Sequence, residues 1–382
     1  MTQSITNKKI LIVCNSTFAY NQFLVNLVNK LNKLKNEIYL IAGKDNNNGN
    51  IEKHNLKEVF FVKMPKRKLL SFLSFFHTIR SINKIINILQ PDMIISNNRD
   101  ASSCTRLGMF FLKKNKIKNI YFARGFYFHD DQNYLTWILT YLIEVFLLFK
   151  TDYILSQSKQ DIKKINFINS YINVPISWVG NGVNKTKFKY RKKNFNINKI
   201  QFATTCRITK GKGLDDLLFV FAELVKKFPN IKLTIIGGPV SIDDNLYYDH
   251  LKRIISQYNL TNIVNITGIT NEVYKYLADS DFYLHPSYRE GMPKSLIEAM
   301  STGIIPIASN IRGSNELIIN NKNGFLFPAK NKKELYNSLI KVISLSNDKF
   351  QEMSSFSYKS VEIYNEESYL DRQINGIQNI FK

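Results

Sequence analysis

The sequence is poor in cysteine. Its 382 residues include three cysteines, Cys14, Cys104 and Cys206, which lie far apart and without histidines at zinc-ligand spacing. This pattern predicts neither a structural zinc site nor a disulfide framework, and it is typical of a reducing compartment. The first residues also lack the positive and then apolar layout of a secretory signal. We therefore expect a cytoplasmic protein.

A long uninterrupted apolar run is missing as well. The most apolar stretch runs from Tyr134 to Phe149 and is interrupted by Glu144. A spanning helix needs about 20 apolar residues, so this stretch is too short to be one. The favoured interpretation is a buried helix, and a membrane-facing helix is the alternative.

Acidic residues are scarce relative to basic ones. The chain has 30 Asp and Glu against 53 Lys and Arg, a formal net charge of +23 and a pI near 9.7. Such a balance attracts nucleic acid, anionic lipid or a small anionic substrate. Composition explains part of it equally well, because Lys, Asn and Ile are abundant together, as in proteins of AT-rich genomes. Nucleic acid is not the favoured partner, since no RRM, KH or helix-turn-helix signature is present and the basic residues are scattered.

A glycine-rich dinucleotide fingerprint is also absent after the first expected strand, which counts against a dehydrogenase. What is present is an alternation of short apolar runs and longer helical patterns in both halves of the chain. The expected strands are KILIVC, EIYLIAG, DMIIS, NIYFA and DYILS, then IQFATTC, IKLTIIGG, NIVNIT, DFYLHP, IIPIAS and GFLFP. Unbroken apolar strands followed by helices predict parallel sheets covered on both faces. We predict an α/β protein with two doubly wound, Rossmann-like domains facing each other across a cleft.

The predicted boundaries follow from a break in this alternation. Residues 186–199 are polar and basic with no apolar period, which is typical of a linker. We predict a first domain over 1–185, this linker, and a second domain over 200–365. The last helical stretch, 366–382, is expected to pack back on the first domain.

A basic turn follows the first strand of the second half, in CRITKGKGLDDLL. Arg207 and Lys212 lie there with glycines between strand and helix. An arginine and a lysine at such a position can neutralise a diphosphate, although a solvated basic turn is the alternative. The glycine spacing is not that of a P-loop.

Two glutamates, Glu290 and Glu298, lie further along in HPSYREGMPKSLIEAMSTG. Pro293 suits the first helical position, which places Glu290 in the loop and Glu298 more than a turn inside the helix. Free N–H groups at the helix start can receive an anion, and carboxylates can accept hydrogen bonds from sugar hydroxyls. We expect Glu290 to hold the transferred sugar of a nucleotide-sugar and Glu298 its ribose. On their own, two such glutamates are more often surface residues.

These motifs together resemble the retaining GT-B glycosyltransferases of family 4. REGMPKSLIEA has that family's Glu-x7-Glu pattern, RITKGKG its Arg-x4-Lys-Gly element, and WVGNGVNKTKF its Asn-Gly-Val element. The first half is similar, more weakly, to the branch that builds capsule, O-antigen and related lipid-linked glycans. IYFARGFYFH and PDMIISNNRDASSCTRLG carry that likeness.

The resemblance implies a hexosyl or N-acetylhexosaminyl transferase that uses a nucleotide-sugar, usually a UDP-sugar, and a lipid-diphosphate-linked glycan acceptor. It implies no cofactor and no metal. Arg207, Lys212 and Glu290 would be catalytic, with the first two stabilising charge on the departing diphosphate. The donor-binding residues that it implies are Arg207, Lys212, Glu290, Gly291, Met292, Pro293, Lys294, Ser295 and Glu298.

The acceptor side is less well marked. Arg124 stands where many relatives have a histidine, and a cation there could meet an acceptor diphosphate; Tyr127 and His129 are nearby candidates. We expect docking on an anionic membrane surface, at the inner face of the cytoplasmic membrane, through Lys66, Arg67 and Lys68. A core helix with a solvated basic start is the alternative for that segment. A sugar-nucleotide epimerase of the same fold, or a basic nucleic-acid- or membrane-binding protein, is the alternative function.

Overall fold

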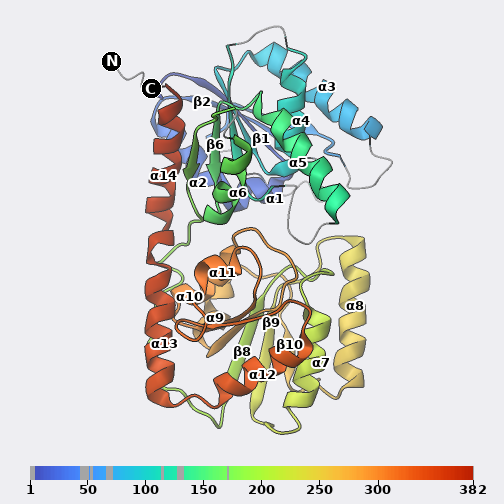
Figure 1. Cartoon of the computed structure of the whole chain (residues 1–382), viewed down its shortest axis with the longest axis vertical. Helices are drawn as coiled ribbons and strands as arrows, with labels where there is room; N and C mark the ends of the chain where they lie inside the picture. The colour runs from blue at the N-terminus through green and yellow to red at the C-terminus, as the bar shows by residue number, and fades with distance from the viewer. Residues whose placement is uncertain are drawn as a thin grey trace. The chain divides into compact units, whose positions relative to one another are not determined.

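The computed structural model describes residues 5–43, 51, 55–65, 72–112, 116–126, 133–169 and 172–381. The chain divides into two compact units. Unit 1 comprises Met1–Gly180 and Glu367–Lys382, and unit 2 comprises Asn181–Glu366. Each unit is a parallel sheet with helices packed on it (Figure 1), so each has the Rossmann-like architecture that the sequence predicts.

Unit 1 has a seven-stranded parallel sheet within its described residues, in the order β3-β2-β1-β4-β5-β6-β7. Its first strand faces apolar neighbours on both sides, because Ile10 and Ile12 join one buried cluster while Leu11 and Val13 join another. The strands are β1 (Lys9–Cys14), β2 (Glu37–Gly43), β3 (Glu58–Val62), β4 (Met93–Asn97), β5 (Lys118–Ala123), β6 (Tyr153–Ser156) and β7 (Ile176–Trp178). The sequence does not predict β3 and β7, which are short strands at the two edges.

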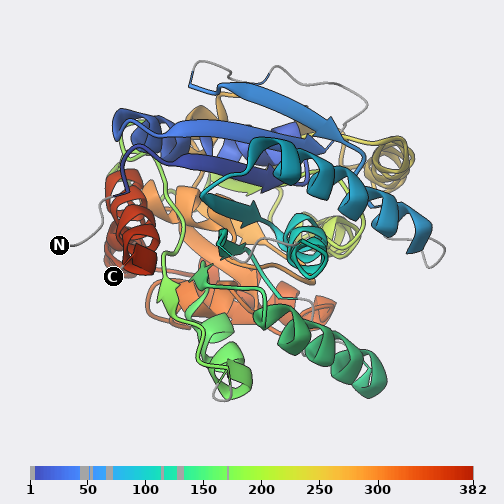
Figure 2. The ribbon, with the colours of Figure 1, turned by 90° about the horizontal axis from the view of Figure 1, so that it is seen from above.

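Helices cover both faces of this sheet. The helices of unit 1 are α1 (Thr17–Phe23), α2 (Val25–Lys33), α3 (Phe72–Leu89), α4 (Arg99–Met109), α5 (Tyr134–Leu148), α6 (Lys159–Asn169) and α14 (Glu366–Gln378). Apolar residues of α1, α2 and α14 share one cluster with the sheet, whereas α3 and α4 share the cluster on the other face. In Figures 1 and 2, α3 and α5 run out past the strands on the same side.

The favoured interpretation of α5 as a buried helix is wrong. Its side chains at Leu135, Leu139, Leu142 and Phe146 are all exposed, while Glu144 is buried. The helix is apolar almost all round, so the sequence pattern carries no sign of which side faces the protein. Within the described residues, no helix combines the length and the apolar character needed to cross a bilayer.

Unit 2 has a six-stranded parallel sheet in the order β10-β9-β8-β11-β12-β13. Every strand expected in this half is present: β8 (Ile200–Thr205), β9 (Ile231–Ile236), β10 (Val264–Ile266), β11 (Phe282–His285), β12 (Ile305–Ser309) and β13 (Phe325–Phe327). The helices are α7 (Leu214–Leu224), α8 (Ile242–Gln257), α9 (Val273–Ala278), α10 (Lys294–Ser301), α11 (Ser314–Leu317), α12 (Lys332–Ile343) and α13 (Asn347–Ser360). The sequence analysis does not anticipate α13.

The stretch 186–199, expected to be a linker, lies inside unit 2. The Arg191 amide donates a hydrogen bond to the Thr302 carbonyl oxygen (3.2 Å), and the Phe195 ring stacks on Phe350 at 4.9 Å. Aromatic residues of this stretch pack against α13. The polar, basic composition of the stretch gives no sign of this packing. Residues 367–382 belong to unit 1, where Tyr369 and Ile377 of α14 join the core.

Candidate functional site

The basic turn after β8 and the loop after β11 lie against each other, because these two strands are neighbours in the sheet. Gly213 precedes α7 with φ 70°, a left-handed conformation that favours glycine. A Cβ at this position would lie 2.1 Å from the Pro286 carbonyl oxygen, so the contact also requires glycine. The Tyr288 amide donates to the Gly211 carbonyl oxygen at 2.9 Å. The two predicted motifs therefore form one site.

A lysine and a glutamate from the two motifs are in direct contact. Lys212 Nζ lies 2.6 Å from Glu290 Oε1 although the residues are 78 positions apart. The side chain of Glu290 is 17% exposed. Burial on its own raises the pKa of Glu290, but the charge of Lys212, helped by His285, brings that pKa below its usual value. Glu290 is therefore ionised at neutral pH.

His285 completes this group and is missed by the sequence analysis. Its Nε2 lies 3.6 Å from Glu290 Oε1 and has no hydrogen-bond partner within the described part of the chain. Burial lowers the pKa of His285 to about 4, although Glu290 acts in the opposite direction. The imidazole is therefore neutral at neutral pH. Its position as the last residue of β11 is the signal that could have identified it, since ligands bind beyond the carboxyl ends of parallel strands.

Backbone contacts fix the loop that carries Glu290. Asn181 Nδ2 donates to the Met292 carbonyl oxygen at 2.9 Å. Gly313 has φ 84°, and a Cβ there would lie 1.7 Å from the Gly291 carbonyl oxygen. The asparagine of the Asn-Gly-Val element thus holds the loop through a hydrogen bond to its backbone. Together with the close contact at Gly313, this bond restricts the conformation of the loop.

Helix α10 begins one residue later than expected. Pro293 is its N-cap residue, with ψ 107°, and makes no capping hydrogen bond with its side chain. The first N–H groups of a helix lack partners within the helix, so this end can accept an anion. Gly291, Lys294 and Ser295 are partly exposed there, whereas Met292 and Pro293 are buried.

Glu298 lies one turn further into α10. Its side chain is 16% exposed, and its Oε1 lies 3.9 Å from Lys294 Nζ. Burial raises the pKa of Glu298 to about 7, and Lys294 opposes that shift only in part. The carboxyl group is therefore about half protonated at neutral pH, unlike that of Glu290.

Arg207 is oriented by a carboxylate that the sequence analysis does not identify. Its Nε donates to Asp244 Oδ2 at 2.7 Å, and its side chain is 50% exposed. Burial would raise the pKa of Asp244, but hydrogen bonds from Arg207, Thr209 and the α8 start lower it to about 2. Asp244 also forms a capping box with Ser241, so the Ser-x-x-Asp spacing in SIDD could have revealed this position.

The acceptor-side candidates lie in unit 1. Arg124 follows β5, donates from Nε to Asn97 Oδ1 at 2.7 Å, and has its guanidinium 3.8 Å from the Phe23 ring centroid. Burial lowers the pKa of Arg124. Tyr127 and His129 lie outside the described residues, as do Lys66, Arg67 and Lys68. Nowhere in the described ranges do three or more His, Cys, Asp or Glu side chains form a group that could hold a metal ion.

Residues 184–360 match the family described as Glycosyl transferases group 1. This stretch contains every donor-site candidate from Arg207 to Glu298. Unit 2 carries a group 1 glycosyltransferase domain. The assignment to family 4 is finer than this match and stays a prediction.

Relatives of the group 1 domain extend the likeness into unit 1. An uncharacterised glycosyltransferase of Methanocaldococcus jannaschii is 29% identical over 271 residues, 67% of each chain. A UDP-Gal:alpha-D-GlcNAc-diphosphoundecaprenol alpha-1,3-galactosyltransferase of Escherichia coli is 27% identical over 58% of this chain and 59% of its own length. The capsular polysaccharide biosynthesis glycosyltransferase CapM of Staphylococcus aureus is 24% identical over 71% of this chain and 73% of its own length.

The solved structure of HepE from Anabaena in complex with UDP-glucose matches both units. It covers 98% of this chain and all of its own, with a TM-score of 0.75 and 16% identity. At this identity the likeness concerns the fold. The chain therefore has the GT-B fold, with two parallel-sheet, Rossmann-like domains, as the sequence predicts.

Proposed function

We propose that the chain is a retaining glycosyltransferase that moves a hexose or N-acetylhexosamine from a UDP-sugar to a lipid-diphosphate-linked acceptor in bacterial polysaccharide synthesis. The observation that carries this proposal is the contact of Lys212 with Glu290 beside the open start of α10, inside a group 1 glycosyltransferase domain. The printed names of the E. coli and S. aureus relatives, and UDP-glucose in HepE, support the donor, the acceptor and the pathway.

In the proposed complex the diphosphate lies against the start of α10, where backbone N–H groups and the side chains of Arg207 and Lys212 meet its charge. This charge grows as the bond from the anomeric carbon to the diphosphate breaks, so fixed cations lower the barrier. Arg207 is held by Asp244 through Nε and donates to Ser241 Oγ through Nη2 at 3.4 Å, which leaves Nη1 of a half-exposed guanidinium to meet phosphate oxygens. On this proposal the reaction requires no metal.

The two glutamates hold the two sugars in this proposal. Ionised Glu290 accepts hydrogen bonds from hydroxyls of the transferred sugar, and Glu298 accepts those of the ribose. The acceptor hydroxyl attacks the anomeric carbon on the face from which the diphosphate departs, and its proton passes to a diphosphate oxygen. No protein nucleophile is required, and the configuration at the anomeric carbon is retained.

Unit 1 is proposed to bind the acceptor. Arg124, at the carboxyl end of β5, has no ion pair with a carboxylate in the described part of the chain. A buried cation without such a partner gains most from an anionic ligand, and an acceptor diphosphate is one. Tyr127 and His129 stay as further acceptor-side candidates.

The donor site is tested by thermal shift of the whole chain with UDP, GDP and their sugars. We expect UDP and one UDP-sugar to raise the melting temperature of the wild type, and Arg207→Ala and Glu298→Ala to lose that response. The exposed residues Arg253 and Glu223 provide matched controls, and Arg253→Ala and Glu223→Ala should respond as the wild type does. A wild type that responds to no nucleotide, or site variants that respond fully, would contradict the proposal.

Transfer itself is tested with the donor so identified and a diphosphoundecaprenol-linked sugar. An extended lipid product made with EDTA present is the expected result. Conversion of the donor into its epimer without any acceptor would instead identify an epimerase.

A further inference from the structure

The outward face of α5 carries a row of large, exposed apolar side chains. Its large side chains recur at intervals of three and four residues, so they line one side of the helix. The exposed residues of this face, hereafter the α5 face, are Leu135 (78% exposed), Leu139 (60%), Leu142 (56%), Ile143 (41%), Phe146 (49%) and Phe149 (65%). Monomeric soluble proteins rarely leave such a contiguous row uncovered, so the α5 face indicates a partner.

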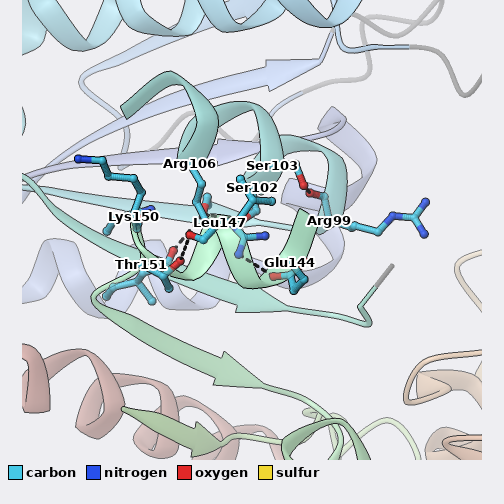
Figure 3. Close-up of polar contacts among 11 residues, drawn as sticks. Arg99, Ser102, Ser103, Arg106, Glu144, Leu147, Lys150 and Thr151 are labelled. Carbon is cyan, nitrogen blue, oxygen red and sulfur yellow. Dashed lines mark hydrogen bonds and ion pairs between the residues drawn. The ribbon is translucent and has the colours of Figure 1, made fainter. Parts of the chain in front are cut away.

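The one acidic or basic residue of α5 is turned away from this face. Glu144 Oε1 lies 2.6 Å from Arg106 Nη1 of α4, and both side chains are fully buried. Figure 3 shows Arg106 and Glu144 meeting between the two helices. The guanidinium of Arg106 also lies 4.1 Å from the Tyr121 ring centroid. The charge of Glu144 is therefore neutralised inside unit 1, and the α5 face presents no charge of its own.

Aromatic and basic residues border the α5 face. Phe110 stacks on Phe146 at 4.5 Å, and Lys150 Nζ lies 5.1 Å from the Phe110 ring centroid. Phe111 is 71% exposed beside them, and Lys116 is exposed shortly after it. An apolar row with aromatic rings and a lysine at its border is the pattern of a helix that lies in a membrane interface.

Net charge decides between a bilayer and a second copy of the chain as the occupant. Unit 1 contains 27 Lys and Arg against 13 Asp and Glu, which gives a net charge of +14. This charge repels a second unit 1 and attracts anionic lipid. The 15 residues of α5 are about 22 Å long, shorter than the ~30 Å hydrocarbon core, so the helix lies along the surface.

We propose that the α5 face docks unit 1 on an anionic bilayer, with its apolar side chains among the acyl chains and Lys150 at the headgroups. This places the docking surface on α5, apart from the 66–68 segment expected from the sequence. The docking stands without the proposed function. Its use, which is to bring the chain to a lipid-linked acceptor, rests on that function.

Flotation of the full chain with vesicles tests this docking. We expect the wild type to float with phosphatidylcholine–phosphatidylglycerol vesicles and to float much less with phosphatidylcholine alone. The double variant Leu139→Asp, Phe146→Asp should lower the bound fraction about tenfold, because two carboxylates then face the acyl chains. Leu246→Asp is the matched control, since Leu246 is an equally apolar, 66% exposed residue on α8 of unit 2, and it should float normally.

A second measurement needs no change on α5. The chain has two tryptophans, of which Trp137 lies on α5, so Trp178→Phe leaves Trp137 as the single reporter. Vesicles with brominated acyl chains should quench its fluorescence and unbrominated vesicles should not. The UDP thermal shift of the double variant should equal that of the wild type, so failure of the donor site and failure of docking give separate results.

Two outcomes overturn the proposal. One is a wild type that does not float and whose Trp137 is not quenched by brominated lipid. The other is a wild type that sediments as a dimer which the double variant abolishes, with flotation unchanged. The second outcome would assign the α5 face to a second copy of this chain.

Discussion

The two units have similar parallel sheets, but they differ at the start of one equivalent helix. In each, a strand that pairs with the first strand of the unit leads into a helix: β4, beside β1, leads into α4 in unit 1, and β11, beside β8, leads into α10 in unit 2. At the start of α4, a side chain of unit 1 already binds a free backbone N–H group: Asn15 Oδ1 accepts a hydrogen bond from the Ala101 amide at 2.7 Å. The start of α10 follows a proline that makes no side-chain cap. The same topology thus provides a helix start that a side chain from the loop after β1 meets in unit 1, and a helix start behind a proline, where we propose that an anion binds, in unit 2.

Buried charge is distributed just as unequally. In unit 1 the pair of Arg106 and Glu144 is fully buried and joins two helices, whereas in unit 2 the pair of Lys212 and Glu290 is partly exposed and joins two loops. A fully enclosed pair can serve only the packing around it, and a partly open pair can exchange partners with a ligand. The four predictions below test this contrast.

The largest effect is expected in unit 1, where Glu144→Ala leaves the Arg106 guanidinium buried and unpaired. This should lower the free energy of unfolding by about 3–5 kcal/mol, measured by urea denaturation of the whole chain. The double variant Arg106→Met, Glu144→Leu removes both charges and should recover most of the loss. A single variant as stable as the wild type would show that the pair is not enclosed.

In unit 2, Lys212→Ala should affect activity more than stability. Removal of one charge that stabilises a departing group costs about 10²–10³ in kcat, measured as UDP release from the UDP-sugar found by thermal shift. Lys226→Ala, at an exposed position in the turn after α7, is the matched control and should keep the wild-type rate. An unchanged rate in Lys212→Ala would place the diphosphate elsewhere.

A smaller effect is expected from pH at Glu298, whose pKa in the free chain is raised to about 7 by burial. Ribose hydroxyls favour the ionised carboxylate, so donor binding should lower this pKa and release a proton. Affinity should therefore fall about tenfold per pH unit below pH 7 and level off above it. Titration calorimetry with a UDP-sugar, whose diphosphate does not titrate in this range, measures the slope, and Glu298→Gln should abolish it. A slope that persists in Glu298→Gln belongs to another group.

The smallest effect concerns the helix start in unit 1. Asn15→Ala removes the side chain that meets the start of α4 and should destabilise the chain by about 1 kcal/mol, seen as a lower urea midpoint. Asn15→Asp should recover only part of the stability, because a carboxylate accepts the same hydrogen bond but repels Asp100, to whose Oδ2 Asn15 Nδ2 donates at 3.4 Å. UDP binding should be unchanged in both, since the proposed donor site lies in unit 2. Loss of UDP binding in Asn15→Ala would remove the distinction drawn between the units.

Much of unit 2 could be predicted from the sequence because its chemistry is local. Unbroken apolar runs identify every strand there, and the short loops after β8 and β11 hold the charged residues at fixed spacing. The contact between Lys212 and Glu290 follows once β8 and β11 are known to be neighbours. The Ser-x-x-Asp spacing and the end of a strand mark Asp244 and His285 in the sequence, but their contacts with Arg207 and Glu290 follow only from the fold.

Unit 1 is harder to predict, because its distinctive features are surfaces and not motifs. The apolar pattern of α5 is the same whether a helix is enclosed or exposed, and one contact, from Glu144 to Arg106, decides which side turns inward. Arg124 illustrates the same difficulty. Its sequence position suggests a role, but the aromatic rings and the asparagine that hold it come from β4, β5 and α1.

The contact between Lys212 and Glu290 has a consequence for selectivity. A free phosphate that binds Lys212 must displace the carboxylate of Glu290, and it provides no sugar hydroxyl to replace the lysine as a hydrogen-bond donor. A nucleotide-sugar displaces this carboxylate as well, but the hydroxyl groups of its sugar can then donate hydrogen bonds to Glu290. Asp244 accepts a hydrogen bond from Arg207 in a similar way. If unit 2 binds a nucleotide-sugar as proposed, its built-in carboxylates weaken the binding of the abundant simple phosphates of the cell relative to that of a nucleotide-sugar.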